Sequence, residues 1–110
     1  MNDETLTQRN IMIALSSYNC LVLRQQSGVL YDSKGQRVRV GFPGLSDLLV
    51  VRPDGQACFL EIKTDHKAFK RPEQIKFIDA MKKRGHRADF VTTVDEALAV
   101  VFGEENHEKI

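Results

Sequence analysis

The sequence predicts a single α/β domain with the element order α-β-β-β-α-β-α. Two observations lead to this fold class: apolar residues recur at helical spacing in three segments, and short runs rich in branched side chains lie between them. The chain has 110 residues, 42% of them hydrophobic, which suits one core rather than two domains. We expect the domain to span residues 1–103, followed by a charged tail at 104–110.

The first third of the chain is expected to contain a helix, a strand and a basic connection. Apolar residues at helical spacing predict the helix over residues 4–19, and Thr-Leu-Thr-Gln at 5–8 matches a capping box that would start it there. A short branched run predicts a strand at 20–23. Glycines, basic residues and an Asp-Ser-Lys-Gly turn signal predict a basic loop or small hairpin over 25–43.

The remaining elements are a hairpin and two helices separated by a strand. Residues 47–51 and 57–63 are predicted strands, and Pro-Asp-Gly at 53–55 favours a tight antiparallel turn between them. Both strands are apolar on both faces until their far ends, which indicates that helices cover both sides of the sheet. The elements that follow are a helix from Pro72 that stops at Gly85, a strand at 88–91, and a helix opened by a capping box at 93–96 and ended by Gly103.

Several classes of protein are excluded by simple features. No apolar run approaches the roughly 18 residues of a membrane helix, and the acidic first residues are unlike a signal peptide. Cys20 and Cys58 lie singly in apolar stretches without Cys-x-x-Cys spacing, so we expect buried free thiols. These features predict a cytoplasmic protein with no membrane partner.

Charged residues lie at the ends of the two hairpin strands, where the apolar run of each strand would otherwise continue. Asp47 begins one strand, while Glu61 and Lys63 end the other. If the turn holds residues 53–55, Asp47 lies directly opposite Glu61 on one face of the sheet. A register shifted by one residue would instead turn Asp47 to the opposite face.

Two carboxylates placed side by side repel each other unless a cation lies between them. Oxygen ligands with open positions suit Mg²⁺ or Mn²⁺, and such an ion activates water and stabilises charge on a phosphoryl oxygen. Lys63 could orient that water. The alternative is a salt bridge among Asp47, Glu61 and Lys63, and spacing alone leaves both interpretations open.

Two helices carry polar residues on otherwise apolar faces. Gln74 lies three and four residues before Phe77 and Ile78, which puts it on the buried stripe, within reach of the same metal, water or phosphate. Glu4 shares a face with Ile11 and would aim a third carboxylate at the interior. The alternative for Glu4 is a role only in starting its helix.

These motifs together resemble a known family. Gly44-Leu45-Ser46-Asp47, then Glu61-Ile62-Lys63, then Gln74 resemble the motif set of the PD-(D/E)XK nucleases, and more narrowly of their VRR-NUC branch, the virus-type replication–repair nucleases. The lead-in at 39–44, Glu4-x-x-x-Gln8 and Pro72-Glu73-Gln74 match that branch too, so the resemblance covers residues 4–100. Ser46 departs from the pattern, because the superfamily has Pro before the Asp.

The resemblance implies a restriction-endonuclease-like core, a central mixed sheet flanked by helices, and a Mg²⁺- or Mn²⁺-dependent deoxyribonuclease. Asp47 and Glu61 would hold the metal together with the backbone carbonyl of Ile62. Lys63 would position or activate the attacking water, and Gln74 would support the site. No organic cofactor is expected.

The resemblance also implies a partner and a context. Glu4 would add an outer or second-metal contact. Small stand-alone members of the family resemble bacterial or phage enzymes acting in DNA repair on branched DNA, such as four-way (Holliday) junctions. Because symmetric cutting of a junction needs two active sites, a homodimer is implied.

The charge distribution supplies a separate indication. The net charge is only +1, but residues 62–87 carry +6, residues 24–41 carry +3 and residues 88–110 carry −5. The motif residues lie between the two basic stretches, so a basic rim is expected to bind the phosphate backbone. The candidate contacts are Arg37, Arg39, Lys67, Lys70 and Arg71.

The leading hypothesis is therefore a metal-dependent, structure-selective DNA endonuclease. Two alternatives remain open at this point: a catalytically silent DNA-binding module with a nuclease fold, and an exonuclease or RNA-directed nuclease with the same site.

Overall fold

The computed structural model describes residues 3–25, 28–42 and 44–108. Its elements in chain order are α1 (Asp3–Ser17), β1 (Leu21–Arg24), β2 (Gly28–Tyr31), β3 (Arg37–Val40), β4 (Leu48–Val51), β5 (Ala57–Ile62), α2 (Pro72–Lys83), β6 (Arg87–Val91) and α3 (Val94–Glu108). The predicted α/β class is confirmed. Two strands more than predicted are present, and both belong to the region expected to be a basic loop or hairpin.

A four-stranded mixed sheet in the order β1-β4-β5-β6 forms the centre of the molecule. The strands β1, β4 and β5 pair antiparallel, and β6 joins β5 in parallel, with α2 as the crossover. Leu48 pairs with Leu60, and the Arg52 N–H donates to the Gln56 carbonyl at 2.9 Å. This is the register in which Asp47 faces Glu61, as the three-residue turn predicts.

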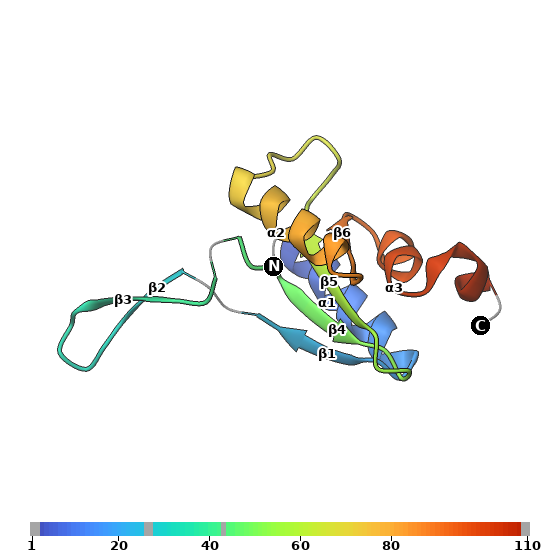
Figure 1. The fold of residues 1–110 in the computed structure, drawn as a ribbon, viewed down its shortest axis with the longest axis horizontal. Coiled ribbons are helices and arrows are strands. Elements are labelled where there is room, and N and C mark those ends of the chain that lie inside the picture. The colour runs from blue at the N-terminus through green and yellow to red at the C-terminus, as the bar shows by residue number, and fades with distance from the viewer. Residues whose placement is uncertain (1–2, 26–27, 43, 109–110) are drawn as a thin grey trace.

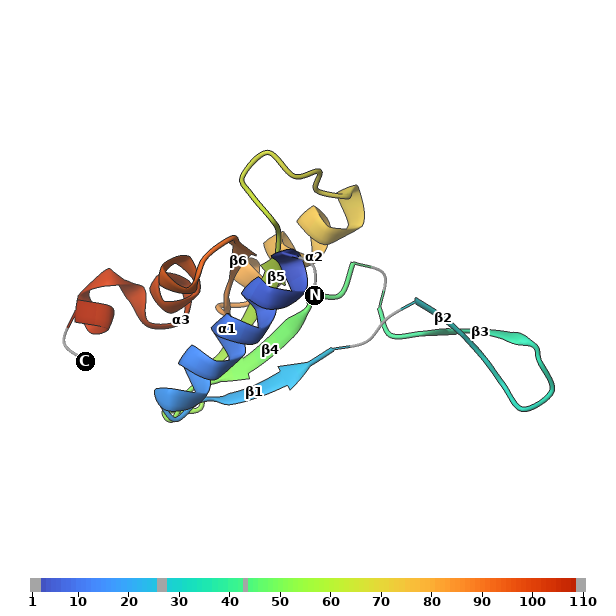
Figure 2. The same cartoon turned by 180° about the vertical axis from the view of Figure 1, so that it is seen from behind.

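Helices cover both faces of this sheet, as the sequence predicts. The helix α2 lies in front of the sheet in Figure 1, and α1 lies in front of it in the reverse view of Figure 2. Ile11 and Leu15 of α1 pack with Leu60 and Val101 in the larger core, while Phe77 of α2 belongs to a second core on the other face. The sheet is therefore sandwiched, and its α2 face receives the side chains of Phe59 and Glu61.

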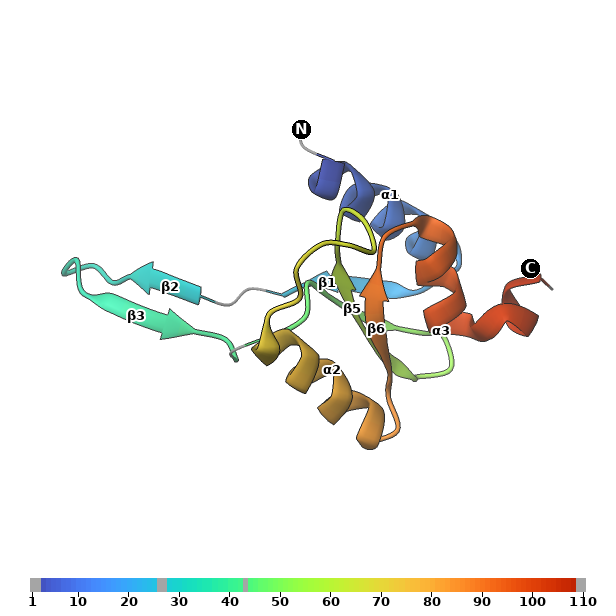
Figure 3. The ribbon, with the colours of Figure 1, turned by 90° about the horizontal axis from the view of Figure 1, so that it is seen from above.

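The hairpin of β2 and β3 forms a separate two-stranded sheet that projects from the body (Figure 3). Its turn is organised by Asp32, whose Oδ1 accepts the N–H groups of Lys34 at 2.8 Å and Gln36 at 2.9 Å. The side-chain period of two and the pairing of Tyr31 with Arg37 put Tyr31, Arg37 and Arg39 on one face.

The ends of two helices differ from the sequence expectation. The helix α1 begins at Asp3, so Thr5 lies inside it and the predicted capping-box start is wrong. Acidic Asp3 and Glu4 in the first turn suit the positive end of the helix dipole instead. Gly103 breaks α3 with φ 77°, but helical residues resume and continue to Glu108, where a frayed tail was expected. Residues 109 and 110 of that tail lie outside the described residues.

Two simpler expectations can be compared directly with the structure. Cys20 and Cys58 are both free and buried, as predicted. Burial raises the pKa of the Cys58 thiol to about 11, so it behaves as an apolar side chain. Within the described residues, no helix has both the length and the apolar character needed to cross a membrane.

Candidate active site

The site lies where β4 begins and β5 ends, on the face of the sheet that α2 covers. Asp47 directly precedes β4, and its carbonyl accepts the Gln25 N–H at 2.9 Å, which continues the pairing of β1 with β4. Ser46 is fully buried and donates its hydroxyl hydrogen to the Leu48 carbonyl at 3.2 Å. The departure from Pro at this position therefore supplies a hydrogen bond that fixes the entry into the strand.

Asp47 and Glu61 share this edge, but they are held differently. Asp47 is half-buried, and its Oδ2 accepts the backbone N–H of Ile62 at 2.7 Å. Glu61 is only 4% exposed; its Oε1 accepts a hydrogen bond from Gln74 Nε2 at 2.9 Å. The other oxygen, Oε2, is buried and has no hydrogen-bond partner among the described residues.

Burial and the neighbouring Asp47 carboxylate raise the pKa of Glu61 to about 8. Burial is the larger cause, because it disfavours the charged form, and the like charge of Asp47 adds to it. Lys63 and Arg71 act in the opposite direction but do not compensate. Together these surroundings favour the neutral form of the Glu61 carboxyl group.

Gln74 joins the parts of the site, although it lies on α2 rather than on the sheet. It is 4% exposed, as the apolar stripe predicts. Its Oε1 accepts hydrogen bonds from Lys63 Nζ and from the Arg71 backbone N–H, both at 3.0 Å. These two donors fix which end of the amide is oxygen, so the NH₂ group is directed to Glu61.

Gly44 allows α2 to come close enough for this contact. Its φ is +80°, and a Cβ built there would lie 2.2 Å from the Glu73 carbonyl oxygen and 3.0 Å from the Gln74 nitrogen. The chain before Asp47 therefore touches the backbone of the first turn of α2. Only glycine satisfies both the conformation and the space.

Lys63 does not form the salt bridge that the sequence left as an alternative. No ion pair within 4.0 Å joins it to Asp47 or Glu61 in the part of the chain that the structure describes, and its ammonium is hydrogen-bonded to the neutral Gln74. The Lys63 ammonium and the two carboxyl groups are thus neighbours without a direct ion pair among the described residues.

Glu4 is not gathered into this cluster. It is exposed in the first turn of α1, and no group of three or more His, Cys, Asp or Glu side chains able to hold a metal is found among the described residues. Ile62 has its side chain in the core, and its N–H already serves Asp47. The roles suggested for Glu4 and for the Ile62 carbonyl stay predictions.

The five candidate DNA contacts fall into two groups. Arg37 and Arg39 are exposed on β3 of the projecting hairpin, whereas Lys67, Lys70 and Arg71 are exposed on the connection from β5 to α2. The Lys70 ammonium lies 4.9 Å from the centre of the Phe90 ring. Both groups stand on segments that lead directly into or out of the carboxylate site.

One contact beside the site was not predicted. His66 Nε2 lies 2.7 Å from Glu96 Oε2, and Glu96 Oε1 also accepts the Thr92 hydroxyl hydrogen at 2.8 Å. These residues and Lys63 line a cavity of about 340 Å³ between the connection and α3. The sequence signal was the capping box at 93–96, whose Thr93 hydroxyl does accept the Glu96 N–H; it gave no sign of His66.

Comparisons with known proteins bear on the fold. No protein-family model matches the chain, and no curated protein matches it either. A solved structure described as a VRR_NUC domain superimposes with a TM-score of 0.67 over 92% of this chain and 96% of its own, at 23% sequence identity. The chain therefore has the fold of a VRR-NUC domain, as the motif resemblance predicts.

Proposed function

We propose that this protein is a metal-dependent DNA endonuclease that hydrolyses phosphodiester bonds. The observation that carries the proposal is the pair of carboxylates at the ends of β4 and β5, one of which has a buried oxygen with no hydrogen-bond partner in the described part of the chain. The VRR-NUC fold supports the same assignment, since it is the fold that the motif resemblance implies. We further propose that branched DNA is preferred and that a homodimer provides two sites.

The donor set fits a hard divalent cation. Asp47 and Glu61 supply carboxylate oxygens, and the Ile62 carbonyl is a candidate third ligand; oxygen ligands of this kind suit Mg²⁺ or Mn²⁺. A cation would also offset the burial and the repulsion that raise the pKa of Glu61, because it favours the charged carboxylate. When bound, the ion supplies an activated water and stabilises charge on the phosphate.

The remaining residues have distinct tasks in this proposal. Lys63, held at 3.0 Å by Gln74 Oε1, presents its ammonium beside the carboxylates and positions the water or the phosphate oxygen. Gln74 is a positioning residue, because it acts through Lys63 and Glu61 rather than on the substrate. The cations of the hairpin and of the β5–α2 connection bind the DNA backbone on either side.

The test is cleavage of plasmid, linear duplex, flap and four-way junction DNA in Mg²⁺, Mn²⁺ or EDTA. We expect cutting in the metal ions and none in EDTA. Lys63→Ala should abolish cutting but retain binding, whereas Lys76→Ala, an exposed lysine of α2, should behave as wild type. Equal cutting by the wild type and Lys63→Ala would refute the role of Lys63, and DNA binding without cutting would favour the silent binding module.

A further inference from the structure

The two residues that flank the connection between β5 and α2 hydrogen-bond to the same atom of the candidate site. Lys63, at its start, and Arg71, at its end, both donate to Gln74 Oε1 at 3.0 Å. The intervening residues 64–70 form a surface loop, and surface loops frequently carry binding residues. Both ends of the loop are therefore joined to Gln74, the residue that hydrogen-bonds the Glu61 carboxyl.

This loop is held in place by several contacts. Asp65 Oδ1 accepts the Lys67 N–H at 2.8 Å, and the Asp65 carbonyl accepts the Ala68 N–H at 3.2 Å. His66 is paired with Glu96 of α3 at 2.7 Å, and Lys70 lies over the Phe90 ring. The backbone is thus tied to α3 and to β6, so an exposed side chain on it has a defined place.

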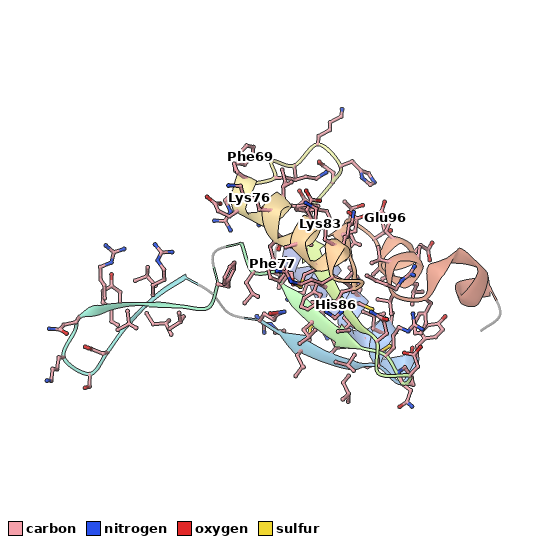
Figure 4. The ribbon with its side chains drawn as sticks, viewed as in Figure 1. Phe69, Lys76, Phe77, Lys83, His86 and Glu96 are labelled. Carbon is pink, nitrogen blue, oxygen red and sulfur yellow. The ribbon has the colours of Figure 1, made fainter. Side chains whose placement is uncertain are left out.

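Phe69 is the large apolar side chain that this loop exposes. It is 76% exposed and stands apart at the start of α2 in Figure 4. The other five phenylalanines each contact another ring or a cation, whereas Phe69 makes no such contact among the described residues. A single exposed apolar residue is ordinary, but this one is flanked by Lys67, Lys70 and Arg71.

The position of Phe69 relative to the site follows from chain geometry. It precedes Arg71 by two residues, so their Cα atoms are at most about 7 Å apart. The Arg71 nitrogen shares Gln74 Oε1 with Lys63. A DNA strand whose phosphate lay beside Lys63 would therefore have its neighbouring nucleotides on the side of the site where the loop carries Phe69.

We propose that Phe69 stacks on an unpaired base next to the cleaved phosphodiester, and so favours DNA with a branch, flap or frayed end over continuous duplex. The proposal rests on the proposed nuclease function. Bases inside a duplex are already stacked on each other, and taking one out costs a few kcal/mol; a base that is already unpaired costs less and leaves a face free for the ring. The flanking cations hold the backbone without reading its sequence.

The test measures binding in EDTA, so that no strand is cut, to two DNA probes of equal length. One probe carries a single-stranded flap with 2-aminopurine as its first unpaired base, and the other is a continuous duplex. We expect Phe69→Ala to weaken flap binding about tenfold, or about 1.4 kcal/mol, with little change for the duplex. Phe69→Trp should restore flap binding.

The fluorescence of 2-aminopurine distinguishes base stacking from non-specific DNA binding. The wild type and Phe69→Trp should quench 2-aminopurine fluorescence, and Phe69→Ala should not. The matched control is Ile13→Ala, which truncates a side chain that is 60% exposed on α1, on the opposite face of the sheet. It should match the wild type in binding and quenching.

The outcomes distinguish this inference from the function on which it rests. If Phe69→Ala binds the flap as tightly as wild type, or loses flap and duplex binding equally, the stacking role is wrong while the nuclease proposal stands. If the wild type neither binds these probes nor cuts DNA in Mg²⁺, both are wrong. Because Phe69 is exposed, an unchanged circular dichroism spectrum is expected for Phe69→Ala.

Discussion

The carboxylate site and the projecting hairpin differ in how their structure is determined. At the site, Lys63 and Glu61 both hydrogen-bond to the side-chain amide of Gln74, while Asp47 accepts the Ile62 N–H, so each side chain is fixed by a partner distant in sequence. The hairpin of β2 and β3 is held by its own pairing and by the Asp32 turn, and its side chains are mostly exposed. The site residues are thus held in place by the fold, whereas an isolated two-stranded hairpin is only marginally stable alone.

The largest effect expected from this difference is that of Gly44→Ala. The new Cβ would lie 2.2 Å from the Glu73 carbonyl oxygen, and the φ of +80° is itself unfavourable, so we expect at least about 3 kcal/mol of lost stability. Gly35→Ala, in the hairpin turn with φ +79° and nothing within 4 Å, should lose only about 1 kcal/mol. Urea unfolding of both variants measures the difference, and equal losses would show that the close approach at Gly44 is unimportant.

Gln74→Ala should have the next largest effect. It removes the hydrogen bond from Gln74 Nε2 to the buried Glu61 carboxyl and frees Lys63, which should cost about 1–3 kcal/mol of stability. Cleavage should fall at least tenfold, because Lys63 loses its fixed position. The control is Ile75→Ala, the exposed neighbour on α2. Full activity of Gln74→Ala at a temperature where it is folded would contradict the positioning role.

Removing the hairpin cations should change binding without changing stability. Arg37 and Arg39 share an exposed face, so the double alanine variant should lose about two units from the slope of log K against log salt concentration. Lys83→Ala, on an exposed lysine at the end of α2, is the control for a change of charge elsewhere. A salt slope equal to that of wild type would remove the hairpin from the DNA interface.

The smallest effect is expected for His66→Ala. The His66 side chain is 75% exposed, and exposed ion pairs contribute about 0–1 kcal/mol, so the thermal midpoint should fall by only a few degrees. If the pair with Glu96 orders the loop, cleavage should fall a few-fold while that of Asp95→Asn stays unchanged. Differential scanning fluorimetry and cleavage rates are the measurements. Cleavage by His66→Ala at the wild-type rate would show that the loop does not need the contact between His66 and Glu96.

The sequence predicts most of the central fold because that part is local or periodic. The Pro-Asp-Gly turn fixes the register that brings Asp47 opposite Glu61, and the apolar stripe of α2 locates Gln74. The start of α1 was mispredicted because a capping box at Thr5 competes with acidic residues that favour an earlier start. The His66–Glu96 pair joins segments that are distant in sequence, and no local pattern specifies it.

The proposed function requires that Asp47 and Glu61 together hold a divalent cation. Its most direct test is calorimetric titration of Mn²⁺ into the wild type, Asp47→Asn, Glu61→Gln and Glu73→Gln, the last being an exposed acid on α2. We predict saturable binding to the wild type and to Glu73→Gln, and loss of that binding in both Asp47→Asn and Glu61→Gln. Wild-type affinity in either of these two variants, or no binding to the wild type, would contradict the claim.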